Sequence, residues 1–175
     1  RPVLCLAIKT DGTLWAWGDN SKGQLGDGTN MTKYVPVQIG SATNWSKVSS
    51  GQLHSISIKS DGTLWSWGSN EFGQLGDGTL SDKSIPVQIG SATDWANISA
   101  GASHNTGIKT NGTLWAWGWN YYGQLGDGTN TDSHVPLQVG VSTDWKTISG
   151  GANESVALKA NGTLWAWGNN IVGQL

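Results

Sequence analysis

The side chains that could do chemistry in this sequence recur at a fixed spacing of 50 residues. Asp27, Asp77 and Asp127 occupy identical Gly-Asp-Gly-Thr segments. An aspartate in such a segment could belong to an acid catalyst or to a calcium site. A catalytic site is normally built once, however, whereas a structural position recurs with its unit. The three copies therefore favour a turn in which each aspartate caps its own backbone.

The histidines and the single cysteine do not form a recognisable metal site. His54 and His104 occupy equivalent positions, and Glu154 takes that position in the third copy. Neither histidine has a cysteine or a second histidine nearby in the sequence, so zinc ligation is weakly supported. Cys5 alone excludes an intrachain disulfide framework and a cysteine-based zinc site. We expect hydrogen-bonding histidines near an inner strand, a small core cysteine, and neither metal nor cofactor.

Other enzyme signatures are also missing. The glycines of segment 23–28 are not followed by the Lys-Ser/Thr pair or the helix of a phosphate-binding loop. No nucleophile elbow or other local triad motif is present. The paired tryptophans, such as Trp15 and Trp17, could stack on sugars, but four copies inside predicted strands favour a core role. The sequence therefore predicts a protein that is not an enzyme.

Composition and charge exclude two classes of partner. The 175 residues carry 10 Lys and Arg against 12 Asp and Glu, a net charge of −2. This balance lacks the basic excess that nucleic-acid binding requires. No apolar run reaches the roughly 18–20 residues of a membrane span. The polar, charge-poor composition fits a secreted bacterial protein, so we expect an extracellular or cell-surface location.

The elements that position these residues belong to an internal repeat. Residues 11–50 and 61–100 are identical at 26 of 40 positions without a gap. The units are approximately 1–50, 51–100 and 101–150, followed by an incomplete unit, 151–175. No linker separates them, so the chain is a single array of residues 1–175. Fixed periods of this length are typical of solenoids and propellers.

Each unit predicts four short strands. In Thr13–Gly18 the two tryptophans share one face and alternate with Leu14 and Ala16, so both faces of the sheet are expected to be buried. His54–Lys59, Val35–Gly40 and Trp45–Ser49 provide the other strand types, and Pro36 suggests an edge position. Asp-Gly and Asn-Gly pairs mark tight hairpins. About 14 strands in four-stranded antiparallel blades predict an all-β propeller, with about 3.5 repeats in this chain.

These segments resemble the regulator of chromosome condensation repeat. The carrying motifs are Trp-x-x-[Val/Ile]-Ser-x-Gly-x-x-His, [Asp/Asn]-Gly-Thr-Leu-Trp-x-Trp-Gly and Gly-Gln-Leu-Gly-Asp-Gly-Thr, and they cover essentially the whole chain. The resemblance implies a propeller, usually of seven blades. The eukaryotic founder of the family is a nucleotide exchange factor for a small GTPase and binds chromatin. Similar bacterial propellers include a secreted protein inhibitor of β-lactamase, and the regular spacing looks like that bacterial branch.

The array departs from the family pattern at its first unit and in its number of repeats. Arg1-Pro2-Val3-Leu4 stands where Gly51-Gln52-Leu53-His54 stands in the next unit. Three and a half repeats cannot close a seven-blade ring alone. We therefore expect either a longer parent chain or self-association that completes a ring or extends the array, because open strand edges invite pairing.

Function is expected where the repeats disagree, since the fold does not dictate those residues. One variable segment follows each Trp-Gly pair, and a second covers residues 30–34, 80–84 and 130–134. Aromatic residues on a rigid rim are typical of binding hot spots. Neutral drift in solvated loops is the alternative. The predicted partner-binding residues are Trp119, Tyr121, Tyr122, Glu71, Phe72, Lys22, Ile171 and Val172.

Three functions remain open at this point. The first is a non-enzymatic propeller that presents variable rim loops to a protein partner. The second is a propeller that binds a glycan or surface polymer through Trp119 and the tyrosines. The third is a guanine nucleotide exchange factor, which would need an inserted wedge; the unbroken 50-residue spacing contains none.

Overall fold

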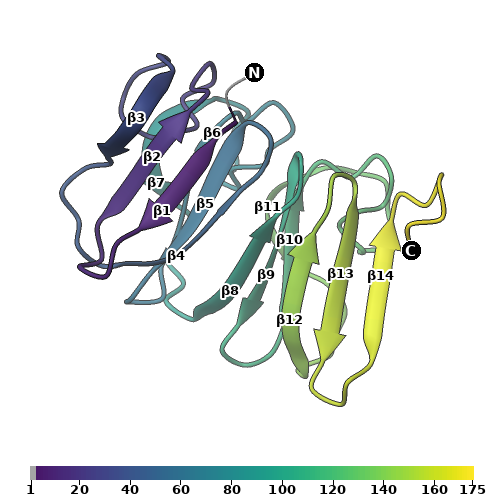
Figure 1. Cartoon of the computed structure of the whole chain (residues 1–175). Helices are drawn as coiled ribbons and strands as arrows, with labels where there is room; N and C mark the ends of the chain where they lie inside the picture. The colour runs from purple at the N-terminus through teal and green to yellow at the C-terminus, as the bar shows by residue number, and fades with distance from the viewer. Residues whose placement is uncertain (1–2) are drawn as a thin grey trace.

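Fourteen antiparallel strands form four sheets that pack face to face in a row in the computed structural model, which describes residues 3–175 (Figure 1). Arg1 and Pro2 lie outside the described residues. The first sheet contains β1 (Cys5–Ile8), β2 (Leu14–Gly18) and β3 (Lys33–Gln38). The second contains β4 (Trp45–Ser50), β5 (His54–Lys59), β6 (Leu64–Gly68) and β7 (Lys83–Gln88).

The other two sheets repeat this arrangement. The third contains β8 (Trp95–Ala100), β9 (His104–Lys109), β10 (Leu114–Gly118) and β11 (Ser133–Gln138). The fourth contains β12 (Trp145–Gly150), β13 (Glu154–Lys159) and β14 (Leu164–Gly168). The predicted all-β class, the four-stranded blades and the strand number are confirmed. Within residues 3–175 no helix is long and apolar enough to cross a membrane.

Each sheet is a meander whose strands follow one another in chain order. The complete sheets run β4-β5-β6-β7 and β8-β9-β10-β11, so the strand that carries the proline lies at an edge, as Pro36 suggested. Their first strands face one another along the array, since β8 contacts both β4 and β12. A complete sheet covers residues 45–88 or 95–138 and therefore begins six residues before the repeat boundary drawn at 51.

Tryptophans form the core between neighbouring sheets. Trp67 is fully buried against Leu14 and Ala16 of the first sheet, and Trp117 is fully buried against the second sheet. Trp65 and Trp115 were expected to be equally buried, but this expectation is wrong: both are only half-buried. Each packs edge to face on the tryptophan that begins the first strand of its own sheet, Trp45 or Trp95, and lines an open groove between sheets.

Short-range hydrogen bonds shape the turns that the repeats share. In the hairpin before β6, Asp61 Oδ1 accepts hydrogen bonds from the amide of Thr63 at 3.0 Å and from its hydroxyl at 2.6 Å. These bonds hold the pKa of Asp61 below its usual range. Asp27 accepts from the amide of Thr29 in the same way at 2.9 Å. The predicted self-capping turn is confirmed at Asp27.

The two equivalent histidines are buried between sheets as hydrogen-bonding residues. His54 Nε2 lies 2.8 Å from Asn105 Oδ1, and His104 Nε2 lies 2.9 Å from Ser155 Oγ. Burial lowers the pKa of each histidine to about 4. Both imidazoles are therefore neutral at pH 7. Cys5 is a free cysteine and only half-buried, so it is not the core residue that its apolar strand suggested.

Candidate partner-binding rim

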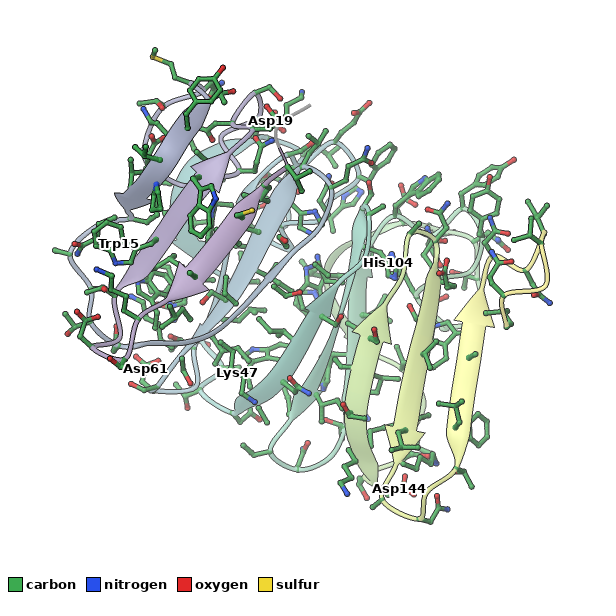
Figure 2. All side chains as sticks on the ribbon, in the orientation of Figure 1. Trp15, Asp19, Lys47, Asp61, His104 and Asp144 are labelled. Carbon is green, nitrogen blue, oxygen red and sulfur yellow. The ribbon has the colours of Figure 1, made fainter. Side chains whose placement is uncertain are left out.

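The variable loops lie at one end of the strands. One set of variable segments directly follows β2, β6, β10 and β14: residues 19–22, 69–72, 119–122 and 169–172. The other set leads into or begins β3, β7 and β11: residues 30–34, 80–84 and 130–134. We call these segments together the variable rim. In Figure 2, Asp19 marks this end of the first sheet, whereas Asp61 and Asp144 lie at the opposite end of the molecule. The hairpins that carry the recurring Asp-Gly and Asn-Gly pairs are therefore far from the rim.

A buried asparagine fixes the two variable segments of each repeat to one another. Asn120 Nδ2 donates to the carbonyl of Thr129 at 3.1 Å and to that of Thr131 at 3.0 Å, while its Oδ1 accepts from the amide of Leu125 at 2.9 Å. Asn20 and Asn70 make the equivalent bonds. Because this support is identical in each repeat, the exposed side chains beside it can vary without changing the backbone.

The third repeat carries a continuous aromatic cluster on this rim. Trp119 and Tyr121 stack with ring centroids 6.1 Å apart and planes inclined by 13°. Tyr122 packs edge to face on both rings, at 5.6 Å and 5.0 Å. Phe72 reaches across from the preceding repeat, 5.4 Å from Trp119. We call these four side chains the rim aromatic cluster; Tyr121 is 65% exposed and the other three are half-buried.

An open hollow of about 520 Å³ lies beside this cluster. Trp119 and Tyr121 form one wall, and the segment from Asn130 to His134 forms the other. Asp132 lines the hollow, and its Oδ1 accepts a hydrogen bond from the amide of Asn120 at 2.8 Å. The hollow thus combines apolar ring faces with carboxylate, amide and imidazole groups.

The contact between the rims of the first and second sheets, the first junction, carries different side chains from the contact between the rims of the second and third sheets, the second junction. At the first junction Lys22 Nζ lies 3.4 Å from Asp82 Oδ2. Adding 50 to each number gives Phe72 and Asp132, so the lysine is replaced by an aromatic ring while the aspartate is kept. Within residues 3–175 no hydrogen bond or ion pair reaches Asp132 Oδ2. Sequence reasoning missed Asp132 as a site residue, because its partner position lies 60 residues earlier in the chain.

The remaining predicted site residues lie on the rim but outside the cluster. Glu71 is exposed next to Phe72. Lys22 belongs to the first junction, where Asp82 neutralises it. Ile171 and Val172 are 76% and 84% exposed on the last repeat. The structure thus brings together Phe72, Trp119, Tyr121 and Tyr122 and leaves the other four predicted residues apart from them.

Elsewhere the molecule offers repeated grooves rather than one deep site. Two equivalent grooves of about 440 and 430 Å³ lie between sheets, and each is lined by a pair of tryptophans, Trp95 with Trp115 and Trp45 with Trp65. Residues 3–175 contain no group of three or more His, Cys, Asp or Glu side chains placed to hold a metal ion. The rim aromatic cluster and its hollow are therefore distinguished by occurring once, where the repeats differ.

Comparison with known sequences identifies the repeat. Two family models described as "Regulator of chromosome condensation (RCC1) repeat" match the chain. The first matches residues 11–58, 61–108 and 111–158, and the second matches residues 45–74, 95–124 and 145–174. No curated protein sequence matches the chain significantly.

Solved structures share the fold. Human WBSCR16 superposes with a TM-score of 0.84 at 22% identity, over 95% of this chain and 45% of that protein. Yeast RCC1 (Prp20), in a crystal structure with Kap60, gives 0.84 at 23% identity, over 96% of this chain and 42% of Prp20. A further structure of Saccharomyces cerevisiae Prp20p, described with its binding to Gsp1p and histones, gives 0.83 at 23% identity, over 95% of this chain and 43% of Prp20p. The chain spans less than half the length of these relatives, and at this identity the similarity concerns the fold.

Proposed function

The chain belongs to the regulator of chromosome condensation repeat family, and from this premise we propose that it is a non-enzymatic binding propeller whose variable rim holds a protein partner. The observation that carries the proposal is the rim aromatic cluster, which occurs once in the array, between the second and third repeats, on a backbone that the repeats share. The propellers in the structural comparison include one crystallised with a protein, Kap60. Protein binding is therefore an activity that this fold supports.

The composition of the rim agrees with a protein interface. Aromatic side chains are enriched at interface hot spots, since they provide a large rigid contact area with few rotatable bonds. Trp119, Tyr121 and Tyr122 are held in place by one another and by the Asn120 network, so little conformational entropy remains to be lost on binding. A solvated loop under neutral drift would have no reason to order three aromatic rings in this way.

A glycan ligand is the second candidate, since the stacked pair Trp119 and Tyr121 offers a flat apolar face beside hydrogen-bonding groups. We favour a protein because Tyr122 packs edge to face against the pair and the Phe72 ring is inclined by 38° to Trp119, so the surface is ridged rather than a flat platform. Exchange-factor activity has no support in the rim, because the two kinds of variable segment keep the same length from one repeat to the next and contain no inserted wedge.

The experiment compares the wild-type chain with a rim-swapped chain in which the third rim carries the residues of the second: Trp119→Ser, Tyr121→Glu and Tyr122→Phe. Both are immobilised, exposed to protein extract and to an array of glycans, and probed by cross-linking and mass spectrometry. The proposal expects proteins that cross-link at residues 119–134 of the wild type and not of the swapped chain. Glycan binding that the swap abolishes, without such proteins, would contradict it.

A further inference from the structure

Comparison of the two junctions shows that the rim hollow lacks a cation. At the first junction, Asp82 Oδ1 accepts the amide of Asn70 at 2.8 Å, and its Oδ2 is paired with the ammonium group of Lys22 at 3.4 Å. At the second junction, Asp132 Oδ1 makes the same 2.8 Å bond to the amide of Asn120, but the lysine position is occupied by Phe72. The second junction therefore keeps the aspartate carboxylate but has no lysine at the position that pairs with it at the first junction.

A second lysine is missing from the same rim. Lys33 lies 3.2 Å from Asp27 and Lys83 lies 3.6 Å from Asp77, whereas the equivalent position of the third repeat is Ser133. The third rim therefore keeps its aspartates and loses both lysines that neutralise them in its sister repeats. Glu71, exposed beside Phe72, adds a further negative charge on the facing loop. Asp132 is the one carboxylate among the side chains that line the hollow, and no ion pair within residues 3–175 neutralises it.

The walls of the hollow suit a cation as well. Trp119 and Tyr121 present ring faces, and a Lys or Arg head group is attracted to such a face by the quadrupole of the ring. The fold already uses this contact, since Lys59 Nζ lies 3.8 Å from the ring centroid of Trp65 and Lys9 Nζ lies 3.9 Å from that of Trp15. An unpaired carboxylate opposite an aromatic face is complementary to one basic side chain.

We propose that the hollow between Trp119 and Asp132 receives a lysine or arginine side chain of the protein partner, with its head group where the Lys22 ammonium group lies at the first junction. The inserted head group pairs with Asp132 Oδ2 and lies against Trp119 and Tyr121. This inference rests on the proposed protein-binding function and adds the chemistry of the residue recognised. It also gives the rim its specificity, because the other junction is already filled by the chain's own lysine.

The test uses the full chain and a defined probe, Nα-acetyl-arginine methylamide, with the neutral citrulline analogue as its isosteric control. Binding is followed by NMR from the ring resonances of Trp119 and Tyr121. We expect saturable shifts with the arginine compound and at least 10-fold weaker binding of the citrulline compound. Equal binding of the two compounds, or no saturable shift up to the solubility limit of the arginine compound, would overturn the proposal.

Two variants act on the charge without disturbing the fold. Asp132→Asn keeps an oxygen for the amide of Asn120 and removes the charge, so arginine binding is expected to weaken at least 10-fold. Phe72→Lys is expected to block the hollow from within, as Lys22 does at the first junction, and to weaken binding by a similar factor. Asp82→Asn is the matched control and should change the affinity less than 2-fold. Unchanged affinity in both Asp132→Asn and Phe72→Lys would refute the assignment.

The outcomes separate this inference from the function on which it rests. If the rim-swapped chain loses its protein partner while Asp132→Asn retains both partner and arginine affinity, the cation site is wrong and the protein-binding rim stands. If arginine binds as expected but the rim swap leaves the partner's affinity unchanged, the hollow is a cation site and the protein partner binds elsewhere. Oligosaccharides that shift the Trp119 and Tyr121 resonances where arginine does not would replace the basic side chain with a sugar.

Discussion

The indole nitrogen of Trp67 donates a hydrogen bond to the main-chain carbonyl of Gln24, 2.8 Å away in the loop between β2 and β3 of the neighbouring sheet. The same bond recurs from Trp117 to Gln74 at 3.1 Å and from Trp167 to Gln124 at 2.9 Å. Gly26 beside it must remain a glycine, because its φ is +83° and a Cβ would lie 2.8 Å from the Trp67 nitrogen. This hydrogen bond therefore joins the second, third and fourth sheets to the sheet before each of them, next to the variable rim.

The burial of Trp67 between two sheets predicts a large cost of truncation. Trp67→Ala should lower the free energy of unfolding by about 3–5 kcal/mol, because it removes a fully buried aromatic side chain. The Gln24 carbonyl keeps its second hydrogen bond, from the hydroxyl of Ser55 at 2.8 Å. Trp17→Ala is the matched control and should cost less, since Trp17 is only half-buried. Urea denaturation of both variants provides the comparison. Equal losses would show that burial between sheets does not set the contribution of the tryptophans.

The buried histidines predict a loss of stability in acid. Burial lowers the pKa of His54 and His104 from 6.5 to about 4, so between these values the unfolded chain binds protons that the folded chain does not. The free energy of unfolding should therefore fall as the pH falls from about 6.5 to about 4, by about 3 kcal/mol for each histidine. Urea denaturation at pH 7, 5.5 and 4.5 measures the dependence.

The variant His54→Gln isolates one histidine from the other acid-sensitive groups. Glutamine cannot titrate but can still donate to Asn105, so roughly half of the pH dependence in this window should disappear. A pH dependence identical to that of the wild type would contradict the assignment of the effect to His54.

The asparagine network predicts a specific weakening of the rim. Asn120→Ala should lower the free energy of unfolding by about 1–3 kcal/mol, because it leaves buried backbone groups without partners. Faster amide hydrogen exchange is expected at Leu125, which donates to Asn120. Asn170→Ala, at the exposed equivalent position, serves as the control and should have little effect. If both variants behave alike, the network does not fix the rim.

The end sheets predict self-association of a polypeptide that consists of residues 1–175 alone. Leu164 is 70% exposed, whereas its equivalents Leu64 and Leu114 are buried under the next sheet. Exposed apolar surface of this kind favours association. Sedimentation should show a mass that rises with concentration, and Leu164→Lys should suppress the rise. Leu80→Lys, at a 54% exposed rim position, should not. A wild-type monomer at all concentrations would refute this prediction.

The sequence predicts the fold well because the information is local and repeated. Alternation in Leu14–Gly18 and its copies identifies strands, and the 50-residue period identifies blades. The half-burial of Trp65 could not be predicted in this way. Trp65 and Trp67 lie two residues apart on the same face of β6, and their difference depends on how far along the strand the adjacent sheet reaches.

The candidate site was only partly predictable for a similar reason. The aromatic residues of the third repeat stand out by type alone. The pairing of Lys22 with Asp82 joins loops of different sheets, and nothing local indicates that positions 60 residues apart meet. The signal that could have found it is a coordinated change, since Phe72 replaces Lys22 while Asp132 keeps the place of Asp82. That comparison becomes meaningful only once the first pair is known to touch.

The most direct test of the account is the affinity of a purified protein partner for the wild-type and rim-swapped chains, measured by calorimetry beside their free energies of unfolding. The account predicts that Trp119→Ser, Tyr121→Glu and Tyr122→Phe together weaken binding by about 2 kcal/mol or more, as expected for hot-spot residues. Stability should change by less than about 1 kcal/mol, because the second repeat already tolerates these residues. Unchanged affinity at unchanged stability would contradict the rim as the binding surface.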